Sequence, residues 1–263
     1  MTMKFHLFIL IALFCSLSVA SAQKVTSLPE DRNGVAKWKN DPRFPDDTFR
    51  FVRLRPQFHG EWNTDYPDSD LNFSFRLQQM TSIRVNPVPL VLAITDPRLQ
   101  KYPFLYTVET GALDLTPKEI SILRPHLENG GFLMIDDFWG SSEWRKTKKQ
   151  IEKLFPDRPI KELELDHPIF STVFKIKEKP QVPSIGQARR GRSSGVFYEN
   201  GGRTPHYYGV FDEMGRMMVL ICRNTDLGDG WEREGEDPYY FTEFSEKHAY
   251  PMGINIIVYF MTH

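Results

Sequence analysis

A short continuous apolar run, Phe132-Leu133-Met134-Ile135, constrains the fold of this chain most strongly. It shows no alternation of polar and apolar residues, which is typical of a central parallel strand covered by helices on both faces. A helix is predicted over residues 116–129, because Thr116 and Glu119 can form a capping box at its start. Another helix is predicted over about residues 142–154. The run therefore reads as one strand of a strand–helix–strand unit.

The rest of the chain continues this alternation with less regularity. Strands are predicted over residues 49–54, 83–85, 88–95, 104–108, 161–177 and 217–223, helices over residues 68–80 and 252–261, and a long loop over residues 184–204. Strands that alternate with helices favour a parallel sheet with helices on both faces. We therefore expect an α/β fold with a mostly parallel central sheet.

The first 22 residues have the features of a secretory signal peptide. Lys4 is followed by an uncharged apolar run over residues 5–19 and by the small-residue cleavage pattern Ala20-Ser21-Ala22. The run is short for a membrane span of about 20 residues, so we expect cleavage before Gln23 and no membrane span in the mature chain. A periplasmic or secreted location follows. Residues 23–47 are expected to form an extended N-terminal arm, and residues 48–263 one domain.

Charge and cysteine content exclude several classes of function. Loss of Lys4 from the 33 basic residues leaves 32, against 34 acidic residues. Without a basic excess, neither a nucleic acid nor an anionic membrane surface is expected as a partner. Cys222 is the only cysteine that remains, and its apolar neighbours predict a buried, unreactive thiol with no disulfide.

Acidic residues gather where the predicted strands end. Asp136 and Asp137 follow the run at 132–135, residues 224–232 follow the strand at 217–223, and a third acidic loop precedes the helix at 68–80. Ligands of open parallel sheets bind beyond the carboxyl ends of the strands. The candidate ligand-binding rim therefore consists of Asp65, Tyr66, Asp136, Asp137, His167, Asn224, Asp226, Trp231 and Glu232.

Two interpretations of these residues remain open. Adjacent carboxylates can bind a metal or act as general acid and base, but they can also cap helices and brace turns. Likewise, Trp231 could offer a flat surface to a ligand or pack in the core, and His167, which precedes a proline, could be a turn residue. No standard metal-ligand pair or phosphate loop is present, so no cofactor or metal is predicted.

Several segments together resemble the bacterial family called domain of unknown function 4159. They are Phe51–Leu54, Thr64–Asp68, Gly130–Asp137, Asp166–Phe170, Gly215–Val219, Asn224–Glu232 and Pro251–Asn255. The resemblance covers the chain from about residue 48 to its end. That family looks like a member of the class I glutamine amidotransferase-like superfamily, which implies a flavodoxin-like three-layer sandwich.

The resemblance also bears on function. Amidotransferases carry a nucleophilic cysteine in the turn after a central strand, whereas the turn here holds Asp136-Asp137-Phe138, and Cys222 precedes a different loop. We therefore expect a degenerate amidotransferase-like fold that serves as an exported binding or assembly module rather than an enzyme. Its partner would be an envelope protein or a small polar ligand. The alternative is a carboxylate- or metal-dependent hydrolase acting on a carbohydrate-like substrate.

Overall fold

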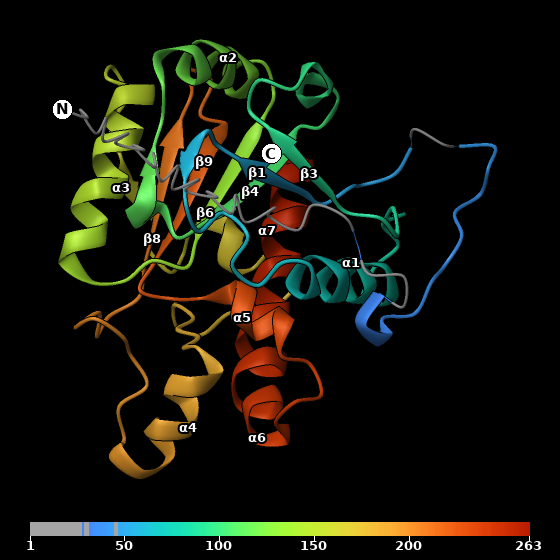
Figure 1. Cartoon of the computed structure of the whole chain (residues 1–263), viewed down its shortest axis with the longest axis vertical. Helices are drawn as coiled ribbons and strands as arrows, with labels where there is room; N and C mark the ends of the chain where they lie inside the picture. Colours follow the sequence, from blue (N-terminus) through green and yellow to red (C-terminus); the bar gives the residue numbers. More distant parts are fainter. Residues whose placement is uncertain (1–27, 29–31, 45–46) are drawn as a thin grey trace, which may run out of the picture.

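A seven-stranded sheet forms the centre of the molecule (Figure 1). The computed structural model describes residue 28 and residues 32–44 and 47–263, so the predicted signal peptide lies outside the described residues. The strand order is β3-β1-β4-β6-β9-β8-β7. The parallel strands are β1 (Val52–Arg55), β3 (Leu90–Ala93), β4 (Phe104–Val108), β6 (Phe132–Asp136) and β9 (Met217–Arg223), and β8 (His206–Phe211) and β7 (Lys161–Glu162) continue the sheet antiparallel.

Helices cover both faces of the sheet. On one face, Phe73 of α1 (Asp68–Met80), Trp231 of α5 (Leu227–Glu232) and Ile254 of α7 (Tyr250–Thr262) share a core with the sheet. On the other face, α2 (Pro117–Glu128) and α3 (Gly140–Leu154) pack through Leu123 and Ile151. These layers confirm the predicted three-layer α/β sandwich with a mostly parallel sheet.

The order of the parallel strands locates the point where a ligand is expected. Taken in chain order, the five parallel strands lie in the order 2-1-3-4-5, which is the flavodoxin-like order. The direction of winding reverses between β1 and β4, and open α/β sheets bind ligands at such a switch point beyond the carboxyl ends of the strands. The loops that follow β1 and β4 therefore flank the place where a site is expected.

The shorter elements complete the description. They are β2 (Phe58–His59), paired antiparallel with β5 (Leu113–Asp114), the helices α4 (Ile185–Ser194) and α6 (Pro238–Tyr240), the 3₁₀ turns η1 (Arg32–Gly34), η2 (Pro97–Lys101), η3 (Thr110–Ala112) and η4 (Pro168–Phe170), and the π-helix η5 (Phe241–Ala249). Part of the N-terminal arm lies against the domain, where the indole nitrogen of Trp38 donates a 2.7 Å hydrogen bond to the carbonyl of Val85.

Three predicted elements are wrong. The strand expected at 83–85 does not form, and only Val85 makes an isolated parallel bridge with Phe49. The expected loop at 184–204 contains α4, because Ser184 caps the amide of Gln187 and Gly195, at φ +70°, ends the helix. The expected strand at 161–177 stops at Glu162, and the chain then turns into η4. Beyond that turn, the amides of Val173 and Phe174 donate to the side chain of Asn255 on α7 instead of to a neighbouring strand.

Among the described residues, none of the helices has both the length and the apolar character that a membrane crossing requires.

Candidate metal centre

Three adjacent parallel strands end in the same unusual way. Glu109 follows β4, Asp137 follows β6 and Asn224 follows β9, and these residues have φ values of 51°, 49° and 60°. Asp65, in the loop between β2 and α1, has a φ of 61°. Left-handed backbone is uncommon for residues other than glycine, and it concentrates at functional sites. Four polar residues in this conformation therefore surround one edge of the sheet.

The residues that follow these strands are joined to one another by backbone hydrogen bonds. The amide of Glu109 donates to the carbonyl of Asp137 at 2.9 Å, and the amide of Asn224 donates to the carbonyl of Phe138 at 3.0 Å. The side chain of Asn224 accepts from the amide of Gly140 at 2.8 Å and donates to the carbonyl of Thr204 at 2.7 Å. Asn224, predicted as a ligand-binding residue, thus holds loops together.

Arg53 positions the loop that carries Asp65. Its guanidinium is fully buried on β1, pairs with Asp70 at 2.6 Å and donates to the carbonyl of Thr64 at 2.6 Å. Tyr66 stacks its ring 5.8 Å from the same guanidinium. Tyr66 therefore supports the loop, and the side chain that the loop brings to the carboxylate-rich edge is that of Asp65.

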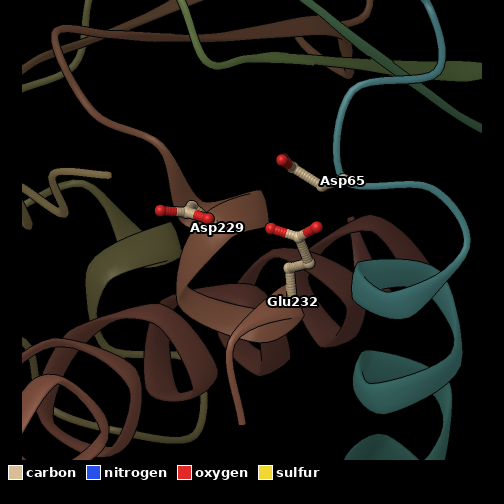
Figure 2. A group of neighbouring side chains, drawn as sticks. All are labelled: Asp65, Asp229 and Glu232. Atoms are coloured by element: carbon tan, nitrogen blue, oxygen red, sulfur yellow. The ribbon is translucent and has the colours of Figure 1, made fainter. Parts of the chain in front are cut away.

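Six carboxylates meet at this edge, and we call them the acidic cluster. Its members are Asp65, Asp136, Asp137, Asp226, Asp229 and Glu232. Within it, Asp65, Asp137 and Asp226 form an inner triad, and Asp65, Asp229 and Glu232 form an outer triad (Figure 2). In each triad, one ligand oxygen from every residue lies within 4.8 Å of the others. Two oxygens that bind one Ca²⁺ at about 2.4 Å are at most about 4.8 Å apart.

Asp136 lies beneath the triads and is completely buried. Its Oδ2 accepts hydrogen bonds from the hydroxyl of Tyr106 at 3.2 Å and from the amide of Gly228 at 3.0 Å. Among the described residues, no group donates a hydrogen bond of normal geometry to its Oδ1 or to the enclosed Oδ2 of Asp65. Buried carboxylate oxygens without donors are costly, so the cluster has unmet capacity for a positively charged group.

Burial and mutual repulsion favour the protonated forms of these acids. Burial, together with the neighbouring carboxylates, raises the pKa of Asp65 to about 8 and that of Glu232 to about 9. Burial raises the pKa of Asp136 to about 7, and burial with nearby carboxylates raises those of Asp137 and Asp226 well above their usual range. A bound cation would relieve this repulsion and return the acids to their charged forms.

Glu109 extends the acidic character of the edge. Its carboxyl is hydrogen-bonded with that of Asp137, and burial, with the charges of Glu61 and Glu143, raises its pKa to about 7. Glu109 is not among the predicted site residues. Its position directly after the strand at 104–108 is the signal that could have indicated it.

Two of the predicted site residues lie elsewhere. His167 packs against Phe211 and Tyr259. Because Phe211 pairs with Met217, the first residue of β9, His167 lies at the amino end of that strand, opposite the acidic cluster. Trp231 is 1% exposed and packs 4.3 Å from Phe73, so it belongs to the core and offers no surface to a ligand. The predicted positions of His167 and Trp231 at the ligand-binding rim are therefore wrong.

The segment at 224–232 is a helix start rather than a loop. Asp226 caps α5 by accepting from the amide of Asp229 at 2.7 Å. Residues three apart lie on one face of a helix, so Asp229 and Glu232 project together from α5, with Asp226 at its N-cap. Asp229 is therefore a member of the cluster that the sequence prediction omitted, and the spacing of three is the signal that would have included it.

The fold and the cluster define an α/β sandwich protein with a carboxylate site at the carboxyl edge of its sheet. The chain belongs to the family described as Domain of unknown function (DUF4159), whose model matches residues 50–261. A search of curated proteins found none that matches the chain.

Proposed function

We propose that this protein is an exported binding or assembly module whose acidic cluster holds a divalent, oxygen-preferring cation such as Ca²⁺, Mg²⁺ or Mn²⁺. Two observations carry the proposal: three carboxylates meet in the inner triad, and Oδ1 of the buried Asp136 has no donor among the described residues. Within the described part of the chain, no lysine or arginine forms an ion pair with Asp65, Asp136, Asp137 or Asp226. The charged forms of these buried acids therefore require a counter-charge from outside the described residues.

The cation would act as a clamp on three loops. Asp65 comes from the loop after β2, Asp137 from the turn after β6, and Asp226 from the start of α5. Asp137 and Asp226 are 6% and 4% exposed. Two cavities, of about 1000 Å³ and about 410 Å³, are lined by other residues. An enclosed cluster of carboxylates suits an ion better than a sugar ring, which favours a binding module over an enzyme acting on carbohydrate.

Thiol chemistry is not part of this proposal. The turn after the central strand β6 carries Asp137 where an amidotransferase carries its cysteine. The thiol of Cys222 is fully buried within β9, and burial raises its pKa well above the usual value, so it forms little thiolate. These observations support the proposal that the protein has a glutamine amidotransferase-like fold without the nucleophilic cysteine.

A metal-dependent hydrolase is the second candidate, and one observation favours it. Asp137 has left-handed backbone in the turn between the central strand and α3, and its carboxyl is hydrogen-bonded with that of Glu109. Two coupled carboxyls beside a cation are the parts that general acid–base catalysis on a metal-bound water requires.

Calorimetric titration tests the cation site. The purified protein, treated with chelator and dialysed, is titrated with Ca²⁺, Mg²⁺ and Mn²⁺, and we expect saturable binding of at least one of them. Asp137→Asn keeps the size of the side chain and removes its charge, so it should weaken binding at least about tenfold. Asp96→Asn is the matched control, because Asp96 pairs with Arg98 at the surface. Absence of binding at millimolar cation would refute the proposal.

Export is tested separately. The signal-peptide pattern at residues 1–22 predicts that the native protein begins at or near Gln23. Sequencing of the N-terminus of protein isolated from the cell envelope measures this. Retention of Met1 would contradict it. Identification of proteins that co-purify reports on assembly partners.

A further inference from the structure

The two triads of the acidic cluster differ in their counter-charges. Among the described residues, no basic side chain forms an ion pair with the inner triad. In the outer triad, Nε of Arg233 lies 3.1 Å from Oδ1 of Asp229 and 2.5 Å from Oε2 of Glu232. The outer triad therefore already has a cation, supplied by the chain itself.

Asp65 connects the two triads. It contributes a ligand oxygen to both, and its enclosed Oδ2 accepts no hydrogen bond from the part of the chain that the structure describes. Figure 2 shows its side chain reaching from the loop before α1 towards Asp229 and Glu232 on α5. A carboxylate shared in this way can bridge two cations, and such pairs lie about 3.5–4 Å apart in proteins.

We propose that the outer triad is a second divalent-cation position and that Arg233 is an internal competitor for it. This inference rests on the proposed function, because it assigns a second position next to the first. The guanidinium can move away from Asp229 and Glu232, since the Arg233 side chain is 38% exposed. It also has another partner, because its second nitrogen lies 3.4 Å from Oε2 of Glu236, whose side chain is 42% exposed.

The consequence is two cation positions of unequal affinity. The first cation enters the uncompensated inner triad, whereas the second must displace Arg233 before it can bind Asp229 and Glu232. Opposite charges in contact attract each other more strongly at a protein surface than in bulk water. Removing the guanidinium charge should therefore tighten the second position by about tenfold or more.

The experiment counts Mn²⁺ ions per chain and measures the affinity of each. Equilibrium dialysis gives the stoichiometry, and electron paramagnetic resonance detects the spin coupling that two Mn²⁺ ions about 4 Å apart produce. Wild type is compared with Arg233→Gln, Glu232→Gln and Asp65→Asn. Arg98→Gln is the matched control, because Arg98 forms a surface pair with Asp96 away from the cluster. Circular dichroism verifies that every variant is folded.

The expected results differ between variants. Wild type should bind one Mn²⁺ tightly and a second more weakly, and Arg233→Gln should tighten only the second, with coupled spins. Glu232→Gln should abolish the second and leave the first, and Asp65→Asn should weaken both. One Mn²⁺ in wild type and Arg233→Gln alike, or a change no larger than in Arg98→Gln, would overturn the inference while leaving the proposed function in place. No Mn²⁺, Ca²⁺ or Mg²⁺ in any variant would overturn both.

Discussion

The amide of Gly228 donates a 3.0 Å hydrogen bond to Oδ2 of Asp136, and this contact joins the first turn of α5 to the end of β6. The approach is close because residue 228 has no side chain. A methyl group on its Cα would lie 2.7 Å from Oδ2 of Asp65 and 2.7 Å from the hydroxyl of Tyr106. The geometry of the acidic cluster thus depends on a glycine at this position.

Gly228→Ala should therefore destabilise the protein by about 1–3 kcal/mol and weaken cation binding, because the added methyl group collides with the carboxyl of Asp65 and the hydroxyl of Tyr106. Urea unfolding and Ca²⁺ titration measure the two effects. Gly60→Ala is the control, since a methyl group there meets none of the described atoms within 4 Å. Equal stability of the two variants would show that α5 does not need this close approach.

The stability of the chelator-treated protein should fall as the pH rises from 7 to 9. The pKa values of Asp65 and Glu232 are raised to about 8 and about 9, whereas in the unfolded chain both acids lose their protons near pH 4. In this range the folded state holds protons that the unfolded state has released, so the free energy of unfolding decreases with pH. The slope is at most about 1.4 kcal/mol per pH unit for each proton.

Ca²⁺ should reverse this loss, and more strongly at pH 9 than at pH 7, because it competes with fewer protons for the same oxygens. Thermal unfolding with and without Ca²⁺ at both values measures the difference. A melting temperature that rises with pH in chelator would contradict the assignment of raised pKa values.

Asp226→Asn separates the capping role of this residue from its charge. Asparagine caps helices as well as aspartate does, so α5 should still begin at residue 227. Because burial and the neighbouring carboxylates already disfavour the charged form of Asp226, its replacement should leave the melting temperature in chelator unchanged or higher, while Ca²⁺ affinity falls at least about tenfold. A large loss of stability without a change in Ca²⁺ affinity would assign Asp226 to the fold alone.

Removal of Arg53 should cost far more than removal of a surface arginine. Arg53→Met leaves the buried carboxylate of Asp70 without its partner, which typically costs about 3–5 kcal/mol. Arg98→Met breaks an exposed pair with Asp96 and should cost about 0–1 kcal/mol. Urea unfolding of both variants makes the comparison. Similar losses would mean that the loop before α1 is held by other contacts.

Cys222→Ala should leave cation binding unchanged and cost about 1–2 kcal/mol through lost packing. The thiol is fully buried, so a thiol reagent should react with it slowly in the native protein and rapidly in urea. Fast labelling of the native protein would contradict this assignment.

Some of the fold could be predicted because local patterns determine it. The helix at 68–80, the strand at 104–108 and the strand at 217–223 have the predicted bounds. The spacing of their apolar residues and the residues at their ends were sufficient to predict where each element begins and ends. The gathering of acids at one edge also followed from the sequence, since all parallel strands present their carboxyl ends on the same side.

The failures have a different origin. His167 lies within the strand expected at 161–177, which ends after two residues, so its distance from the edge depended on a pairing that the sequence did not reveal. Trp231 could not be assigned to the core without knowing that residues 227–232 are helical. Because this helix was not predicted, Asp229 was also left out of the list of predicted site residues. The error for His167 arose from strand pairing between distant segments, and the errors for Trp231 and Asp229 arose from an unpredicted local helix.

The separation of the ligands along the chain has a consequence for the lifetime of the protein. Asp65 lies before the first helix of the sandwich and Glu232 at the end of α5, so neither triad exists until nearly the whole chain has folded. A cation that binds only the native state stabilises it in proportion to the logarithm of its free concentration. Under the proposed function, persistence of this protein would track the divalent-ion content of its compartment, and dilution of that ion would shorten its survival against proteases.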